Sequence, residues 1–376
     1  MNMENISRAV YLPDGKVGKV DLNEPVLRYS RNPILTAADV NRVWTRPEWQ
    51  VVTVHNAGVA RYAGLTYLLF RSHLRCGISV IGLASSRNGL TNWRIHPEPV
   101  LKPATETDHF ATEDRELISQ WIENEGGGVE DPRINPIEGE FAITYSAYHQ
   151  REKNRVRVSL ATTADFLHYT RRGPVAGVDM RNVVIFPEKI EGRYVGLFRP
   201  NDTTAGDIGG IYSQIRIGYS DDWRGGKWEI SDRPIMQTGF GPSAFSDKIG
   251  PGAPPLKTRF GWLNIFHGVR TTMDGNPYVL GVAFHDLKNP EKVQMASLPI
   301  LFPSRADCRL AENQYIHVPQ VVFTCGAVLL EEETVAIYYG GNDTVMNVAF
   351  SNVEVLYRLC RDLGQDPLTG ELRYSI

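Results

Sequence analysis

From Val51 onward, short runs of apolar and aromatic residues alternate with glycine, asparagine, aspartate and proline. This alternation is typical of many short antiparallel strands joined by turns. Three other segments carry helical signals, namely a capping residue followed by apolar spacing or by acids in the first turn. They are residues 36–44 and 112–121, with Thr36 and Thr112 as the predicted capping residues, and residues 351–364. The pattern predicts an all-β chain with a few peripheral helices.

The β-rich part contains a loose internal repeat with a period of about 55 to 75 residues. Each unit begins near a special turn, continues as an aromatic-rich strand and ends on a strand of small and apolar residues. Four strands per unit make one blade, so five units predict a closed five-bladed β-propeller over about residues 51–350. We expect one domain, with residues 1–50 as an extension and the helix at 351–364 packed on the ring. The units begin at Asn56, Val129, Asn182, Gly250 and Phe323.

Composition narrows the classes of function. The 376 residues are 42% hydrophobic with a net charge of −3, so neither a basic nucleic-acid footprint nor a membrane patch is indicated. The polar N-terminus and the lack of an apolar run of about 18 residues predict a cytoplasmic protein. Four cysteines without a CxxC pair, and no carboxylate-rich pattern, predict no metal. A small-molecule or sugar partner is expected, and a homo-oligomer stays open.

Residues 126–148, GGGVEDPRINPIEGEFAITYSAY, place two adjacent carboxylates, Glu130 and Asp131, between three glycines and an aromatic strand. Glycines let a ligand approach the backbone closely. Pro132 favours an extended backbone at Asp131, and Arg133 is a positive neighbour that can tune a carboxyl pKa. The alternative for the tripeptide Asp-Pro-Arg is an ordinary turn with a surface ion pair.

Three basic residues end the aromatic strands of three units. Arg71 follows LLF, Arg199 follows GLF and His267 follows NIF. If the repeat is real, equivalent positions face one axis, and these cationic or titratable groups converge there. The alternative is that each is a surface residue at the end of a strand.

Four ordered blocks of this chain resemble glycoside hydrolase family 130, the β-mannoside phosphorylases. The blocks are GVEDPRI with its TYSAY-type strand, residues 186–200, residues 250–269 and residues 325–344. In phosphorolysis phosphate is the nucleophile, so such a site needs one acid and a set of cations for the dianion. The resemblance implies inorganic phosphate as co-substrate and no other cofactor.

The resemblance also implies a role for individual residues. Asp131 is the proton donor, acting through the 3-hydroxyl of the mannosyl unit, and Glu130 orients its neighbours or is the alternative donor. Lys189 and Arg133 are weaker candidates that brace the site. The phosphate-binding candidates are Arg181, Arg199, Lys248 and His267, and the substrate-binding candidates are Asn56, Arg71, Glu130 and Asp343.

Other positions bear on which acceptor fits. Tyr338 and Tyr339 either offer a stacking face to a sugar or belong to the core. Asn342 and Phe266 depart from the family pattern and are candidates for altering the linkage or acceptor. The insertion at about 104–125 either borders the substrate groove or connects two units.

The leading hypothesis is inverting phosphorolysis of β-1,2- or β-1,4-linked manno-oligosaccharides to α-mannose 1-phosphate and a shortened acceptor. A β-mannosidase of the same family, which uses water, is expected to lack part of the basic set. A non-catalytic carbohydrate-binding propeller does not need Asp131 in a ring of cations. A furanosidase-type five-bladed enzyme should show three separated catalytic carboxylates.

Overall fold

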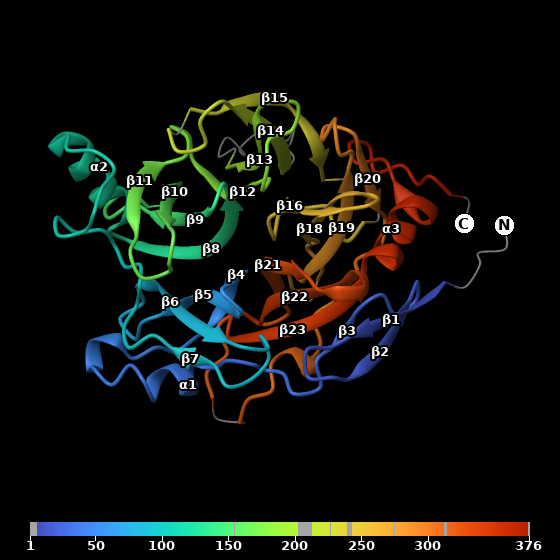
Figure 1. Ribbon diagram of the computed structural model, residues 1–376, viewed down its shortest axis with the longest axis horizontal. Helices are drawn as coiled ribbons and strands as arrows, with labels where there is room; N and C mark the ends of the chain where they lie inside the picture. The colour runs from blue at the N-terminus through green and yellow to red at the C-terminus, as the bar shows by residue number, and fades with distance from the viewer. Residues whose placement is uncertain are drawn as a thin grey trace.

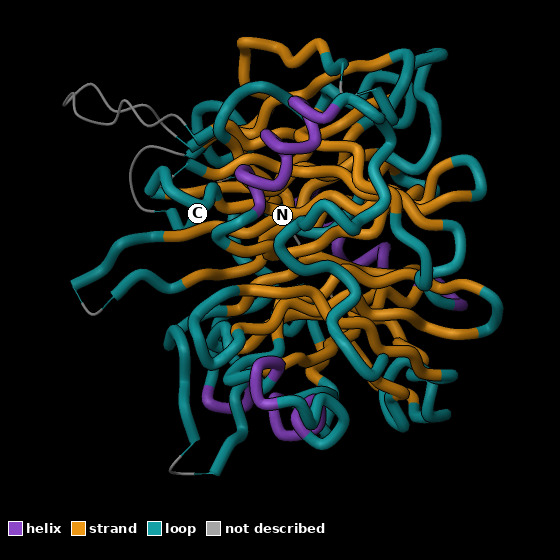
Figure 2. Tube along the Cα trace, turned by 90° about the vertical axis from the view of Figure 1, so that its left-hand side faces the viewer, coloured by secondary structure: helices purple, strands orange, loops and turns teal. Residues whose placement is uncertain are grey.

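Strands make up most of the chain, as the apolar pattern predicts. The computed structural model describes residues 6–153, 155–201, 213–225, 227–238, 243–273, 275–311 and 314–374. In Figure 2 the strands, in orange, form the body of the molecule, and the helices, in purple, are short. No helix of this described part is long and apolar enough to span a membrane.

Five antiparallel sheets stand as blades around one axis (Figure 1). This confirms the predicted five-bladed β-propeller. Most consecutive strands of a blade are neighbours in its sheet, and the first strand of each blade lies nearest the axis. The strands of blades one to three are β4 (His55–Tyr62), β5 (Leu65–His73), β6 (Ser79–Ser86) and β7 (Arg94–Ile95); β8 (Gly128–Ile137), β9 (Glu140–Tyr148), β10 (Val156–Thr163) and β11 (Thr170–Pro174); and β12 (Met180–Ile185), β13 (Tyr194–Pro200), β14 (Gln214–Ser220) and β15 (Glu229–Gln237).

Blades four and five both recruit strands from distant parts of the chain. The last blade takes its fourth strand from the N-terminal region, where Leu27 pairs with Phe350 and Arg28 with Ala349. One sheet thus contains strands from both ends of the ring and joins them. Blade four contains β16 (Lys248–Pro251), β17 (Leu256–Thr258), β18 (Gly261–Val269), β19 (Tyr278–His285), β20 (Val293–Ala296) and β24 (Gly364–Gln365), and blade five contains β21 (Val322–Leu329), β22 (Thr334–Gly341), β23 (Val345–Asn352) and β3 (Leu27–Arg28).

The remaining elements lie outside the blades. β1 (Ser7–Tyr11) and β2 (Val17–Asp21) form a separate hairpin. Thr36 caps α1 (Ala37–Asn41), and Asn352 caps α3 (Val353–Asp362), whose Leu356 and Leu359 are buried against blades four and five. The short 3₁₀ segments are η1 (Pro47–Trp49), η2 (Arg305–Asp307) and η3 (Glu331–Glu333).

The insertion between blades one and two contains α2 (Arg115–Glu125), and its predicted Thr112 cap is wrong. Asp114 caps the helix, because its Oδ1 accepts the backbone N–H groups of Glu116 (2.9 Å) and Leu117 (3.2 Å). The Thr112 hydroxyl instead accepts the N–H of Asp114 (3.2 Å). Figure 1 places α2 at the outer edge of blade two, away from the axis. The connector interpretation of this insertion is therefore favoured over a border of the groove.

A buried ion pair fastens the end of α2 to blade two. The carboxylate of Glu125 accepts from Arg171 and, at 2.8 Å, from the hydroxyl of Tyr145. Glu125→Ala would leave the Arg171 guanidinium, 3% exposed, without this partner, so we expect the free energy of unfolding to fall by about 3–5 kcal/mol. Urea unfolding measures this loss. Glu123→Ala on the same helix is the control, with a change of at most about 0.5 kcal/mol; equal losses in both variants would contradict the anchoring role.

The apolar core is divided into layers between neighbouring blades. Five clusters of buried side chains each join two adjacent blades, from Leu69 and Ile143 between the first two to Val348 and Val54 between the last and the first. Since each blade is covered on both faces, its strands read as nearly continuous apolar runs, as buried strands do. Five such layers hold the inner strands rigidly around the axis.

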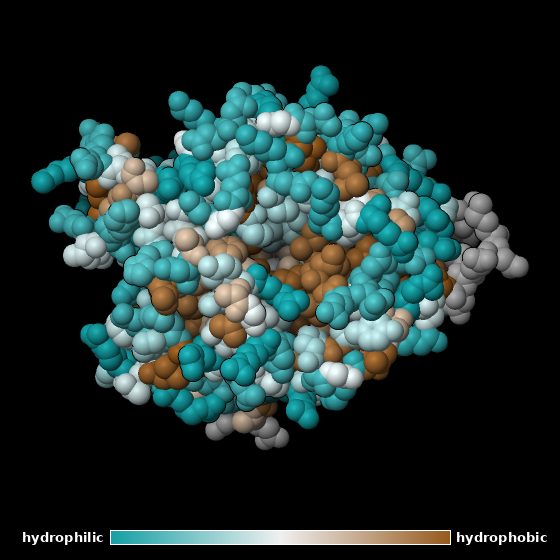
Figure 3. All heavy atoms as spheres, in the orientation of Figure 1, coloured by the Kyte–Doolittle hydropathy of each residue, from teal (hydrophilic) through white to brown (hydrophobic). Residues whose placement is uncertain are grey.

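The two ends of the axis differ in chemistry. A cavity of about 450 Å³ at the N-terminal ends of the inner strands is lined by charged and polar residues. A second one, of about 240 Å³, lies toward the C-terminal ends of the same strands and is lined mainly by apolar residues and prolines such as Ile134, Pro254 and Ala327. Figure 3 shows hydrophobic residues, in brown, gathered around the centre of the face it presents. The polar cavity is the candidate site.

Candidate active site

Three inner strands carry the same irregularity where they reach the polar cavity. The register of β4, β8 and β12 shifts at a bulge, and each bulge contains a residue with left-handed backbone: Asn56 (φ 48°), Asp131 (φ 51°) and Asn182 (φ 58°). Bulges re-aim side chains, and Asn and Asp tolerate this conformation better than most residues. The extended backbone that Pro132 predicted for Asp131 is therefore wrong, because the bulge overrides it.

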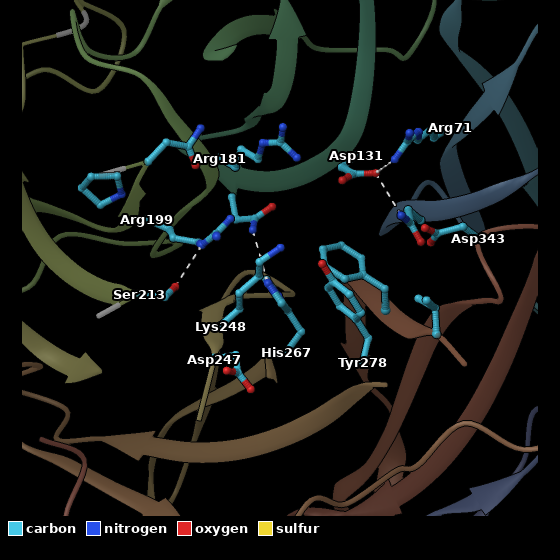
Figure 4. A pocket seen from close by; sticks show the side chains of 16 residues that line it. Arg71, Asp131, Arg181, Arg199, Ser213, Asp247, Lys248, His267, Tyr278 and Asp343 are labelled. Carbon is cyan, nitrogen blue, oxygen red and sulfur yellow. Dashed lines mark hydrogen bonds and ion pairs between the residues drawn. The ribbon is translucent and has the colours of Figure 1, made fainter. Parts of the chain in front are cut away.

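The structure brings together nearly all the candidate residues. Arg71, Asp131 and Asp343 lie on one side of the cavity, and Arg181, Arg199, Lys248 and His267 on the other (Figure 4). Asn56 also lines the cavity and belongs to the first side, because it binds Asp131. Arg71, Arg199 and His267 sit in β5, β13 and β18, the strands next to the inner ones, as the repeat predicted. Glu130 does not line the cavity but binds Arg71 from behind (2.8 Å).

The carboxyl of Asp131 is held through one oxygen. Asn56 Nδ2 and Arg71 Nη1 both donate to Oδ1, each at 3.0 Å. Oδ2 receives no hydrogen bond from any residue that the structure describes. Burial by itself raises the pKa of Asp131, but the charges of Arg71 and Arg133 and the hydrogen bond from Asn56 outweigh it. The pKa lies below its ordinary value, and Asp131 is ionised in the free protein at neutral pH.

Asp343 has the opposite environment. It sits in the turn that joins β22 to β23, where Asn342 (φ 53°) and Asp343 (φ 46°) are both left-handed and Thr344 N donates to Gly341 O (3.0 Å). Burial is the main cause that raises the pKa of Asp343 to about 6, and the charge of Asp131 adds to it while Arg71 opposes it. Two neighbouring carboxyls with pKa values pushed apart form a natural acid–base pair.

The raised pKa of Asp343 should make the free energy of unfolding depend on pH. An acid whose pKa is higher in the folded than in the unfolded chain contributes stability that is complete below about pH 4 and is lost as pH rises through about 6. The rise of the Asp343 pKa from its ordinary 3.8 to about 6 corresponds to about 3 kcal/mol of unfolding free energy. The unfolding free energy of wild type, relative to Asp343→Asn, should therefore fall by that amount between pH 4 and 7. Urea unfolding of both proteins at four pH values measures this difference, and a difference that does not change with pH would contradict the prediction.

The opposite wall is positively charged. Burial, together with the charges of Arg181 and Arg133, lowers the pKa of Arg199 to about 10, and its Nε donates to Ser213 Oγ (3.4 Å). Burial also lowers the pKa of His267 well below its ordinary value, helped by Arg199, Arg133 and Lys248. His267 is therefore a neutral hydrogen-bonding group, and the positive charge comes from Arg181, Arg199 and Lys248.

Arg133 lies beneath the floor and links three blades. It is 1% exposed and donates to Asp131 O (2.7 Å), Gly252 O (3.0 Å) and Asn182 Oδ1 (2.9 Å). With its oxygen bound to Arg133, the amide of Asn182 turns its Nδ2 toward Nε2 of His267 (3.5 Å). Arg133 thus braces the site from below, which is the lesser role that the sequence suggested.

Other candidates lie outside the cavity. Lys189 packs on the ring of Tyr194 (4.7 Å). Tyr338 and Tyr339 are core residues whose hydroxyls donate to Gly89 O (3.0 Å) and Asp307 Oδ1 (2.6 Å), so the stacking interpretation is wrong.

The two departures from the family pattern have structural reasons. Phe266 is buried between blades three and four, with its ring against Phe245 (5.1 Å). Asn342 supports the turn before Asp343, and its Oδ1 accepts from Val321 N (3.3 Å). Neither residue lines the cavity, so neither is placed to choose an acceptor.

Several lining residues were missed by sequence reasoning. Asn182 could have been found, because it begins the third repeat unit as Asn56 begins the first. Phe323 begins the fifth unit and could have been found in the same way, whereas Tyr278 carries no such signal; their rings lie 4.5 and 6.2 Å from that of His267. The remaining missed residues are Pro200, Asn201, Ser213, Asp247 and Val321. Among the residues described, no group of three or more His, Cys, Asp and Glu side chains is arranged to hold a metal ion.

Known proteins share both the sequence and the fold. The glycoside hydrolase family 130 model, described as β-1,4-mannooligosaccharide phosphorylase, matches residues 28–362. A 1,2-β-oligomannan phosphorylase from Thermoanaerobacter sp. (strain X514) is 32% identical over 86% of this chain and 95% of its own. A β-1,4-mannooligosaccharide phosphorylase from Ruminococcus albus is 28% identical, over 89% and 90%.

A solved structure agrees with these relatives. The β-1,2-mannobiose phosphorylase from Listeria innocua, in complex with β-1,2-mannobiose, superimposes with a TM-score of 0.72 at 25% identity, covering 90% of this chain and 99% of its own. The match of sequence, fold and site-bearing blocks extends over most of the ring. The chain is therefore a member of glycoside hydrolase family 130.

Proposed function

We propose that this protein is an inverting β-mannoside phosphorylase that converts a β-linked manno-oligosaccharide and inorganic phosphate to α-mannose 1-phosphate and a shortened acceptor. The observation that carries the proposal is the wall formed by Arg181, Arg199, Lys248 and His267, which faces Asp131 across one cavity. A neutral sugar does not need three cations, whereas a phosphate dianion offsets the cost of burying them.

The two sides of the cavity divide the chemistry. Arg71, Asn56 and Asp343 hold the mannosyl unit, and the basic wall holds phosphate with an oxygen directed at C1. The C1–oxygen bond to the acceptor breaks as the C1–oxygen bond to phosphate forms on the opposite face, so the configuration inverts. The departing oxygen receives a proton from Asp131, through the sugar 3-hydroxyl as the family resemblance implies.

Asp131 must gain a proton before it can donate one. In the free protein its pKa is lowered, and the proton of the carboxyl pair rests on Asp343 near pH 6. A bound phosphate dianion adds negative charge to the cavity and raises the pKa of nearby carboxyls. Phosphate binding therefore prepares the acid as well as supplying the nucleophile.

Incubation with β-1,2- and β-1,4-mannobiose tests the proposal and identifies the linkage. Products followed by ³¹P and ¹H NMR, as phosphate is titrated from zero, should show α-mannose 1-phosphate at a rate that rises with phosphate and saturates. Free mannose formed at a rate indifferent to phosphate would mean that water attacks and that the protein is a mannosidase. Binding without turnover of either sugar would indicate a carbohydrate-binding propeller.

A cytoplasmic site of action is part of the same proposal. All four cysteines, Cys76, Cys308, Cys325 and Cys360, are free thiols, which suits a reducing compartment.

A further inference from the structure

Arg71, which binds Asp131, has a second set of partners on the side facing away from the cavity. Arg71 and His73 are two residues apart in β5, so their side chains point to the same face of the sheet. The register of β5 with β6 places His73 opposite Ser79. Glu130, from the neighbouring blade, reaches both Arg71 Nη2 and Ser79 Oγ, each at 2.8 Å.

Counting donors and acceptors determines the direction of each hydrogen bond. A guanidinium can only donate, so Nη2 of Arg71 donates to Nε2 of His73 (3.0 Å), and the ring proton lies on Nδ1. The hydroxyl of Ser79 donates its single hydrogen to Glu130, so it accepts from Nδ1–H of His73 (3.0 Å). The result is a closed cycle of four hydrogen bonds, each with one donor hydrogen and one acceptor.

The neutral state of His73 agrees with this assignment. Burial first, and then the charge of Arg71, lowers the pKa of His73 to about 3. Protonated His73 would turn a second donor toward Arg71 and break the cycle. With His73 neutral, both Nη2 hydrogens of Arg71 are bound, and the guanidinium is held in the orientation that directs Nη1 at Asp131 Oδ1 (3.0 Å).

We propose that His73 is a positioning residue for Asp131, acting through Arg71, and that Ser79 sets the His73 tautomer needed for this. The kinetic part of this inference rests on the proposed phosphorylase function, but the geometric part does not. His73 is not among the residues that line the cavity.

His73 also packs against other rings, and this offers a competing, purely structural role. Its ring lies 5.7 Å from that of His55 and 4.5 Å from that of His317. Two substitutions separate the roles. His73→Phe keeps the ring contacts and loses the acceptor, whereas His73→Gln loses the ring and places an amide oxygen near the position of Nε2.

Positioning predicts that His73→Gln retains kcat/KM for mannobiose within about fivefold, while His73→Phe loses about tenfold to a hundredfold, the size expected when a catalytic group is misplaced. The KM for phosphate should change less than about twofold in both, because the basic wall belongs to blades three and four. The kcat/KM of Ser79→Ala for mannobiose should lie between those of the two His73 variants. His285→Phe, a buried histidine of blade four, controls for loss of a buried imidazole.

Crystal structures of the two variants give a readout independent of activity. The contact between Arg71 Nη1 and Asp131 Oδ1 should persist in His73→Gln and be lost in His73→Phe. The inference would be overturned if His73→Phe had a higher kcat/KM than His73→Gln, or if the two variants were equally active. It would also be overturned if the contact persisted in His73→Phe and was lost in His73→Gln. If the wild-type protein releases free mannose without phosphate, the phosphorylase proposal fails but the positioning inference does not. The His73 variants are then compared by their rates of hydrolysis instead.

Discussion

Asp131→Asn should lower kcat/KM for mannobiose by at least about a hundredfold, and by up to about ten-thousandfold, the range supplied by general acid catalysis. The amide has nearly the shape of the carboxyl and can still accept from Asn56 and Arg71, so the fold and sugar binding should persist. What it lacks is a transferable proton for the departing oxygen. The loss should therefore appear in kcat more than in KM.

Comparison of leaving groups makes this test specific. An aryl β-mannoside whose phenolate leaves without protonation should be turned over by Asp131→Asn with a much smaller loss than mannobiose. Asp232→Asn, an exposed aspartate on β15, is the matched control and should behave as wild type. Near-normal turnover of mannobiose by Asp131→Asn would move the acid to Glu130 or Asp343, and equal losses on both substrates would indicate a binding role instead.

Arg199→Ala should raise the apparent KM for phosphate by about 30-fold to more than a thousandfold. Truncating one partner of a buried charged contact costs about 2–5 kcal/mol, and every 1.4 kcal/mol is tenfold. His267→Ala should have a smaller effect, about tenfold at most, because a neutral hydrogen bond contributes about 0.5–1.5 kcal/mol. This difference follows from the lowered pKa of His267.

Initial rates at fixed mannobiose with phosphate varied from zero give both values. Arg199→Lys keeps the positive charge but not the planar guanidinium, so its apparent KM for phosphate should lie between those of wild type and Arg199→Ala. The KM for mannobiose should change little in all three variants, since Arg199 lies across the cavity from Asp131 (Figure 4). A larger effect on mannobiose than on phosphate would place the sugar, rather than the nucleophile, against the basic wall.

Much of the architecture could be read from local signals. Turn residues between short apolar runs predict strands, and aligning the runs yields five units whose equivalent ends meet at an axis. That alignment places Arg71, Arg199 and His267 at equivalent strand ends, and the motif GVEDPRI indicates Asp131. Thr36 was identified as a cap because capping depends on residues three positions apart, whereas Thr112 was misassigned because Asp114 competes for the same N–H groups.

The linear order of residues thus determined the number of blades, the family and the side chains that face the axis, because periodicity and turn chemistry are local. Backbone conformation at the bulges, the proton on Asp343 and the neutrality of His267 were decided only by the tertiary structure. The bulges depend on how strands pair, and the two protonation states depend on burial and on charges from other blades, so none of the three is encoded within a few neighbouring residues. The cycle of Arg71, His73, Ser79 and Glu130 exists for the same reason: it joins two blades that only the closed ring places in contact.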